Sequence, residues 1–73
     1  MGLNNDRIAF GDNLRKLRAG RGMSQIEFAE ICGISRAYYG RIERGEHSAT
    51  IDMCFRITNA LGMHISDLFI DMP

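Results

Sequence analysis

Residues 23–45 read MSQIEFAEICGISRAYYGRIERG, and this stretch decides the fold of the 73-residue chain. Ser24, followed three residues later by Glu27, is a capping box, in which each residue satisfies a backbone N–H group at the start of a helix. Apolar residues at helical spacing then predict a helix over about 24–32. The residues of this helix that are expected to face the core are Phe28, Ala29 and Cys32.

A turn that contains Gly33 separates this helix from the next one. Ser35 can cap a second helix over about 35–44, and Gly45 ends it because glycine takes the left-handed conformation at little cost. The inward pair of this helix is Tyr39 and Ile42. Two short helices on a tight glycine turn are the signature of a helix-turn-helix. The second helix of such a pair fits the major groove of B-DNA, which predicts a sequence-specific DNA-binding protein.

Three more helices are expected outside this stretch. One runs over about 6–19, and two follow, over about 51–61 and 65–70. Thr50 can cap the first of the two later helices. Because no segment shows the sustained alternation of a strand, the expected fold class is all-α, with one five-helix domain over 1–73.

The composition fits one compact domain. Hydrophobic residues make up 45% of the chain and charged residues 25%, which excludes a disordered or fibrous class. No apolar run approaches the roughly 18 residues of a membrane span. The N-terminus shows no export signal, so a cytoplasmic location is expected.

The net charge is zero, but the charges are unevenly distributed along the chain. Residues 1–45 hold eight Lys and Arg against five Asp and Glu, whereas residues 46–73 hold one against four. This asymmetry indicates an anionic partner for the N-terminal two-thirds.

Neither catalysis nor a metal is expected. Cys32 and Cys54 are too widely separated for a zinc or redox motif, and both occupy apolar helical positions that favour core packing. His47 and His64 form no spaced ligand set with them. We therefore expect no enzyme activity, no metal and no cofactor.

The outward face of helix 35–44 carries the residues expected to read bases. Arg36 and Arg41 can each form the bidentate contact to guanine, and Ala37 can meet a thymine methyl group. Tyr38 belongs to the same set, and Gly40 is expected to lie on the same outward face. The alternative is a solvated face with ordinary arginines, which the turn and the charge asymmetry argue against.

Phosphate contacts are expected around this face. The N-terminus of helix 24–32 exposes amides that attract phosphate, and Arg44 lies at the end of the second helix. The residues expected to contact phosphates are Ser24, Gln25, Ser35, Arg44, His47 and Ser48. The expected partner is double-stranded DNA, and no membrane is expected to take part.

Residues 14–18 (LRKLR), 22–25 (GMSQ), 33–35 (GIS) and 42–45 (IERG) form a specific combination. With these motifs the chain resembles the Xre/Cro/phage-repressor family over about residues 8–70. The resemblance implies a lambda-repressor-like domain of five helices. It also implies a transcriptional regulator that binds a pseudo-palindromic operator as a homodimer.

Two residue roles follow from the resemblance alone. It implies that Arg18 pairs with Glu43, which gives both residues a structural role. Residues 35–39 are similar to a segment of restriction–modification controller proteins, which implies that Arg36 contacts bases and that Tyr38 lies near the DNA backbone. The chain departs from those controllers at Gly40, His47, Ser48 and Ala49.

The C-terminal third holds more apolar residues than a small core needs. We expect the surplus to form a dimer interface, composed of Met53, Met63, Ile65, Phe69 and Ile70. Two alternatives stay open. The fold could serve as an antitoxin-type module that binds a partner protein, or these residues could simply close the core of a monomer.

Overall fold

The computed structural model describes residues 3–72, and all regular elements in this range are helical. They are α1 (Leu3–Gly20), α2 (Gln25–Cys32), α3 (Arg36–Glu43), α4 (Ile51–Leu61) and η1 (Ile65–Phe69). The all-α class and the order of the elements are as the sequence predicts. Two details differ: α1 begins three residues before Asp6, because residues 3–5 include no helix breaker, and the last element is a 3₁₀ helix.

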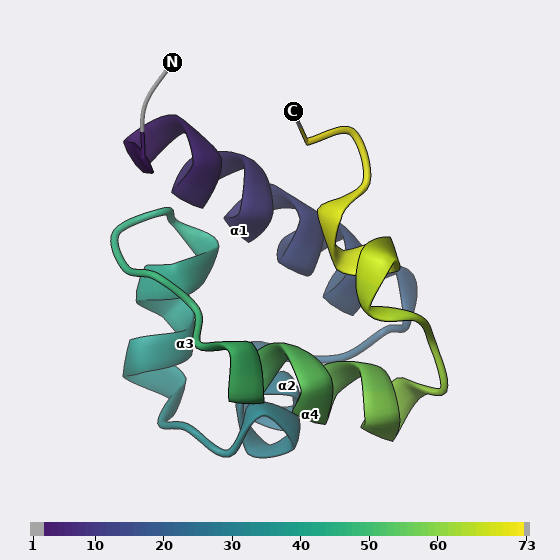
Figure 1. Ribbon diagram of the computed structural model, residues 1–73. Coiled ribbons are helices and arrows are strands. Elements are labelled where there is room, and N and C mark those ends of the chain that lie inside the picture. The colour runs from purple at the N-terminus through teal and green to yellow at the C-terminus, as the bar shows by residue number, and fades with distance from the viewer. Residues whose placement is uncertain (1–2, 73) are drawn as a thin grey trace.

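The helices surround one core. α1 packs against α3 and η1, while α2 packs against α3 and α4. Figure 1 shows α3 on one side of the molecule and the C-terminal segment on the other, with α1 extending across both. None of the helices described between residues 3 and 72 has the length and apolar character needed to cross a bilayer.

The core takes apolar side chains from every helix. Its fully buried members are Leu14, Phe28, Tyr39, Ile42, Ile57 and Leu68. The rings of Phe28 and Tyr39 lie 5.4 Å apart and join α2 to α3. The sequence-predicted inward residues of α2 and α3 are therefore all buried, and Leu17 of α1 is partly buried against the same cluster.

α1 and α3 approach each other at backbone distance. A Cβ atom at Gly11 would lie 2.6 Å from the carbonyl oxygen of Ile42 and 2.8 Å from the carbonyl carbon of Glu43. Only glycine therefore fits at this crossing, which fixes the C-terminal end of α3 against α1.

Candidate nucleic-acid interface

The turn between α2 and α3 is built as the sequence indicates. At the start of α2, Ser24 Oγ accepts a hydrogen bond from the Glu27 amide at 3.1 Å, and Glu27 Oε1 accepts one from the Ser24 amide at 2.8 Å. Ser35 Oγ accepts from the Tyr38 amide at 3.2 Å. Gly33 has a φ of 71°, the left-handed conformation that the turn requires. Both serines therefore cap helices, and each hydroxyl keeps its proton for a further acceptor.

α3 has a buried side and an exposed side. Tyr39, Ile42 and Glu43 are buried, whereas the expected base readers Arg36, Ala37 and Arg41 are exposed. Among the side chains that the structure describes, those of residues 5–72, neither Arg36 nor Arg41 makes an ion pair or a side-chain hydrogen bond. Their guanidinium groups are free to meet a ligand.

Tyr38 differs from the other expected base readers. It is half-buried, and its hydroxyl lies 3.2 Å from Nδ1 of His47. The two rings meet edge to face with centroids 4.7 Å apart. Ser48 Oγ in turn accepts a hydrogen bond from Arg7 Nε at 2.8 Å. The loop after α3 is thus held between Tyr38 and α1.

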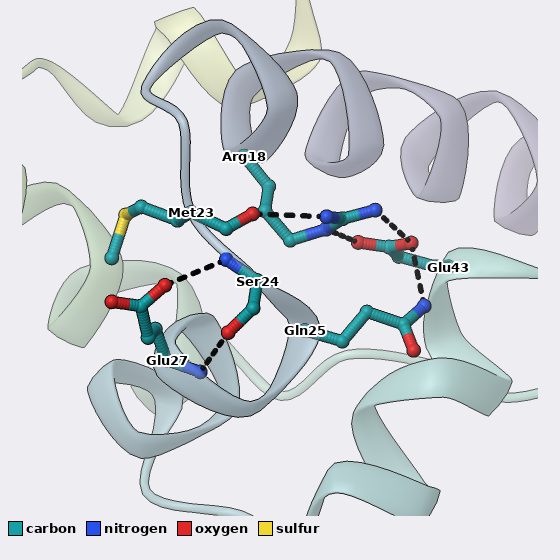
Figure 2. Close-up of polar contacts among 6 residues, drawn as sticks. All are labelled: Arg18, Met23, Ser24, Gln25, Glu27 and Glu43. Carbon is teal, nitrogen blue, oxygen red and sulfur yellow. Dashed lines mark hydrogen bonds and ion pairs between the residues drawn. The ribbon is translucent and has the colours of Figure 1, made fainter.

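Arg18 and Glu43 form the ion pair that the resemblance implies (Figure 2). Arg18 donates from Nε to Glu43 Oε2 at 2.6 Å and from Nη2 to Oε1 at 3.2 Å. Its Nη1 also donates to the Met23 carbonyl at 3.0 Å, so that one guanidinium joins α1, the turn before α2 and the end of α3. The side chains are 18% and 4% exposed, which shields the pair from water.

The surroundings of Glu43 keep it ionised. Burial of the carboxyl raises its pKa, but hydrogen bonds from Arg18 and Gln25 and the charge of Arg18 outweigh that effect and lower the pKa below its ordinary 4.5. The Arg18 pKa is raised, chiefly by the hydrogen bond to Glu43. The pair therefore stays charged at neutral pH.

Gln25 belongs to this network, which sequence reasoning missed. Its amide nitrogen donates to Glu43 Oε1 at 3.1 Å, as Figure 2 shows. Gln25 therefore links the start of α2 to the end of α3, and only its second amide hydrogen is left for a phosphate. The 18-residue separation from Glu43 gives no local signal for this contact.

Arg44 also has a partner that the sequence did not indicate. Its Nε and Nη2 contact the carboxylate of Glu46 at 2.9 and 3.3 Å. The outward position expected for Gly40 is wrong: the residue is buried, and a Cβ atom there would lie 3.2 Å from Arg44 Nη1. A glycine in the middle of α3 thus leaves room for the Arg44 side chain over the helix backbone.

The expected dimer residues do not form one surface. The expectation for Met53 is corrected: it is 3% exposed and belongs to the core, because it lies on the side of α4 that carries Cys54 and Ile57. Ile65 is half-buried against the core. Met63 and Ile70 line a hollow beside α1.

Phe69 lies at a different place from Met63 and Ile70. Its ring packs at a tilt against Phe10, with centroids 5.3 Å apart, and lines a largely apolar cavity of about 410 Å³. Ile51, 62% exposed, lines the same cavity, and Phe55, 49% exposed, lies one turn further along α4. Sequence reasoning missed Ile51 and Phe55, although their spacing of four places them on one helix face.

Between residues 3 and 72, no group of three or more His, Cys, Asp and Glu side chains lies close enough together to hold a metal ion. Cys32 and Cys54 are buried, and burial raises the pKa of Cys32 to about 12. The thiol is therefore protonated at neutral pH. His64 precedes η1, and its amide donates to Asp67 Oδ2 at 3.2 Å.

A profile of the helix-turn-helix family matches residues 14–68. The chain is 35% identical over 71 residues to control protein C.MunI from a Mycoplasma species, covering 96% of each chain. It is 38% identical over 66 residues to control protein C.BamHI from Bacillus amyloliquefaciens, covering 89% of this chain and 82% of that protein.

Among solved structures, the restriction-modification controller protein C.AhdI from Aeromonas hydrophila is similar, with a TM-score of 0.82 and 34% identity. The similarity covers 89% of this chain and 98% of that chain. The family profile, the relatives and the geometry of α2 and α3 all indicate a helix-turn-helix protein. The chain belongs to the helix-turn-helix family of DNA-binding transcriptional regulators.

Proposed function

We propose that the chain is a controller-like regulator that binds a pseudo-palindromic operator as a homodimer, with α3 in the major groove. The observation that carries the proposal is the division of α3. Its buried side and the Arg18–Glu43 pair hold the helix in place, while Arg36, Ala37 and Arg41 project into solvent. A rigid helix with free guanidinium groups suits direct readout of bases.

Contacts with phosphates fix the register of such a complex without reading sequence. We assign them to the residues around the ends of α2 and α3, namely Ser24, Gln25, Ser35, Arg44, His47 and Ser48. Tyr38 is better suited to this set than to base readout, because its hydroxyl is directed at His47. We propose a cytoplasmic location, where the DNA to be regulated lies, and an action that requires no catalysis.

The dimer is proposed to form through α4 and η1, with Ile51, Phe55 and Phe69 at its centre. All three are exposed large apolar side chains: Ile51 and Phe69 line the cavity beside Phe10, and Phe55 lies one turn beyond Ile51 on α4. A second copy would cover apolar surface that the monomer leaves in water. Two α3 helices about 34 Å apart would then meet successive major grooves.

Selection of bound sites from a random DNA library tests the proposal. We expect enrichment of a two-fold related motif whose half-sites are one helical turn apart. A motif without two-fold symmetry would argue against the dimer. If no sequence were enriched, the proposed sequence-specific DNA binding would be wrong, and a protein partner, as in an antitoxin-type module, would be favoured.

A further inference from the structure

Arg44 and Glu46 form an ion pair directly after α3. The Arg44 Nε and Nη2 atoms lie 2.9 and 3.3 Å from the two carboxylate oxygens of Glu46. Both side chains are more than half exposed, at 57% and 53%. The pair therefore lies on the surface, beside the helix proposed to enter the DNA groove.

The carboxylate occupies the edge of the guanidinium that a phosphate would use. A phosphate binds arginine most strongly through two parallel N–H groups, and Nε with Nη2 is one such edge. The other edge includes Nη1, which lies against the α3 backbone, since a Cβ atom at Gly40 would be 3.2 Å from it. A phosphate can therefore bind the Nε–Nη2 edge of Arg44 only after Glu46 has left that edge.

Glu46 is negatively charged at neutral pH. The hydrogen bond from Arg44 and the positive charges of Arg44 and Arg41 lower its pKa below the ordinary 4.5. Its carboxylate thus resembles the phosphate group in charge and in the way it engages arginine.

We propose that Glu46 competes with DNA phosphate for Arg44. In the free protein it binds the guanidinium, and it must be displaced whenever Arg44 contacts a duplex. The inference rests on the proposed function, because it assumes that this face binds DNA. Contacts to phosphate supply nearly all sequence-independent affinity. Glu46 therefore lowers the affinity for every sequence, and a larger share of operator binding is left to base contacts.

The Glu46→Gln variant tests this with a mixed-sequence duplex of about 30 base pairs, which accommodates two half-sites. Fluorescence anisotropy over a series of salt concentrations gives the affinity and its salt dependence. We expect the affinity at low salt to rise about two- to fivefold, the range of an exposed ion pair. The slope of the logarithm of the binding constant against the logarithm of the salt concentration should steepen by up to about the amount that one phosphate contact contributes.

Asp71→Asn is the matched control, since it removes the same charge. Asp71 is exposed in the C-terminal segment, which Figure 1 shows on the side away from α3. Its φ of 60° is a conformation that asparagine also adopts, so the substitution causes no strain. We expect it to change affinity less than Glu46→Gln does. An equal gain in the two variants would indicate a general charge effect and overturn the proposal.

A second test uses an Arg44→Gln background. If Glu46 acts through Arg44, replacing Glu46 there should bring little further gain. A gain as large as in the wild type would overturn the proposal, and so would an unchanged affinity of Glu46→Gln itself. A wild-type protein that binds no duplex at low salt would instead remove the proposed function, so that the two failures are distinguishable.

Discussion

Arg18 of α1 and Glu43 of α3 are joined by two hydrogen bonds, of 2.6 and 3.2 Å, although 25 residues separate them. The same carboxylate accepts a hydrogen bond from Gln25 at 3.1 Å, so that α1, α2 and α3 are joined at one charged group. The carboxylate of Glu43 therefore helps to hold α3 against α1 and α2, together with the packing of Phe28 on Tyr39.

Replacing Glu43 by glutamine should destabilise the fold strongly. Arg18 would keep its charge in a site where it is only 18% exposed and would lose its partner, a change that costs about 3–5 kcal/mol. Urea unfolding monitored by circular dichroism measures the loss. Glu30→Gln, at an exposed position of α2, is the control and should change the free energy of unfolding little. An unchanged unfolding midpoint for Glu43→Gln would contradict a structural role for the pair.

Stability should fall in acid, and Glu43 should account for much of the fall. Because its folded-state pKa is below the ordinary 4.5, the carboxylate stabilises the fold fully above that pH, and the contribution is lost as pH falls through the lower folded value. Unfolding curves from pH 6 down to about pH 3 should therefore show a steeper loss for the wild type than for Glu43→Gln. The residual slope in the variant is expected from Glu27 and Glu46, whose pKa values are also lowered. Parallel curves would show that Glu43 does not titrate as the geometry indicates.

Removing the Arg36 side chain should weaken operator binding and relax specificity at one base pair. A bidentate contact to guanine is worth about tenfold to a hundredfold in affinity for the preferred site. Arg36→Ala should show that loss in gel-shift titrations with the selected operator and much less with mixed-sequence DNA. The fold should be unchanged, since Arg36 is exposed in the N-terminal turn of α3. Equal losses on both duplexes would identify Arg36 as a phosphate contact instead.

The Tyr38 hydroxyl should act through the loop. Tyr38→Phe keeps the aromatic ring against His47 but removes the hydroxyl that lies 3.2 Å from Nδ1. We expect the affinity to fall a few-fold, and by a similar factor on operator and mixed-sequence DNA. A less restrained loop would weaken contacts to phosphates, which do not depend on the DNA sequence. Loss of preference at one base pair only would instead support the role in base readout expected from the sequence.

An acidic residue at Phe55 should separate the dimer. Phe55 is 49% exposed on α4 of the monomer and would be buried in the proposed interface. The carboxylate of Phe55→Asp would therefore lose its contact with water on dimerisation, which costs free energy. Sedimentation of Phe55→Asp at micromolar concentration should show a monomer. Ile26→Asp, at a position on α2 that is 56% exposed, should leave the association unchanged. A wild type that is itself monomeric would end the dimer proposal.

Much of the fold could be predicted because its signals are local. Ser24, Ser35 and Thr50 each accept a hydrogen bond from the amide three residues on, and such caps depend only on neighbouring sequence. The buried stripes of α2 and α3 follow from helical spacing in the same way. The contact between Arg18 and Glu43, by contrast, was expected only from the family resemblance.

Features that depend on how helices dock could not be predicted. Gly40 is read as an ordinary outward position until the Arg44 side chain is placed over it. Composition places Met53 among the surplus apolar residues, because composition does not show which side of α4 faces the core. The spacing of four places Met53 and Ile57 on one apolar stripe of α4, and Ile51 and Phe55 on another. Only the packing of α4 against the other helices shows which stripe is buried.

The division of α3 has a consequence for how such proteins diverge. The side chains that hold the helix, Tyr39, Ile42 and Glu43, are not those proposed to read DNA. Positions 36, 37 and 41 can therefore be exchanged without a compensating change in the scaffold. With these positions as the proposed base readers, point mutations there are expected to change the preferred operator and to leave the fold unchanged. A library randomised at these three positions should stay folded, which would make the chain a small host for selecting new DNA specificities.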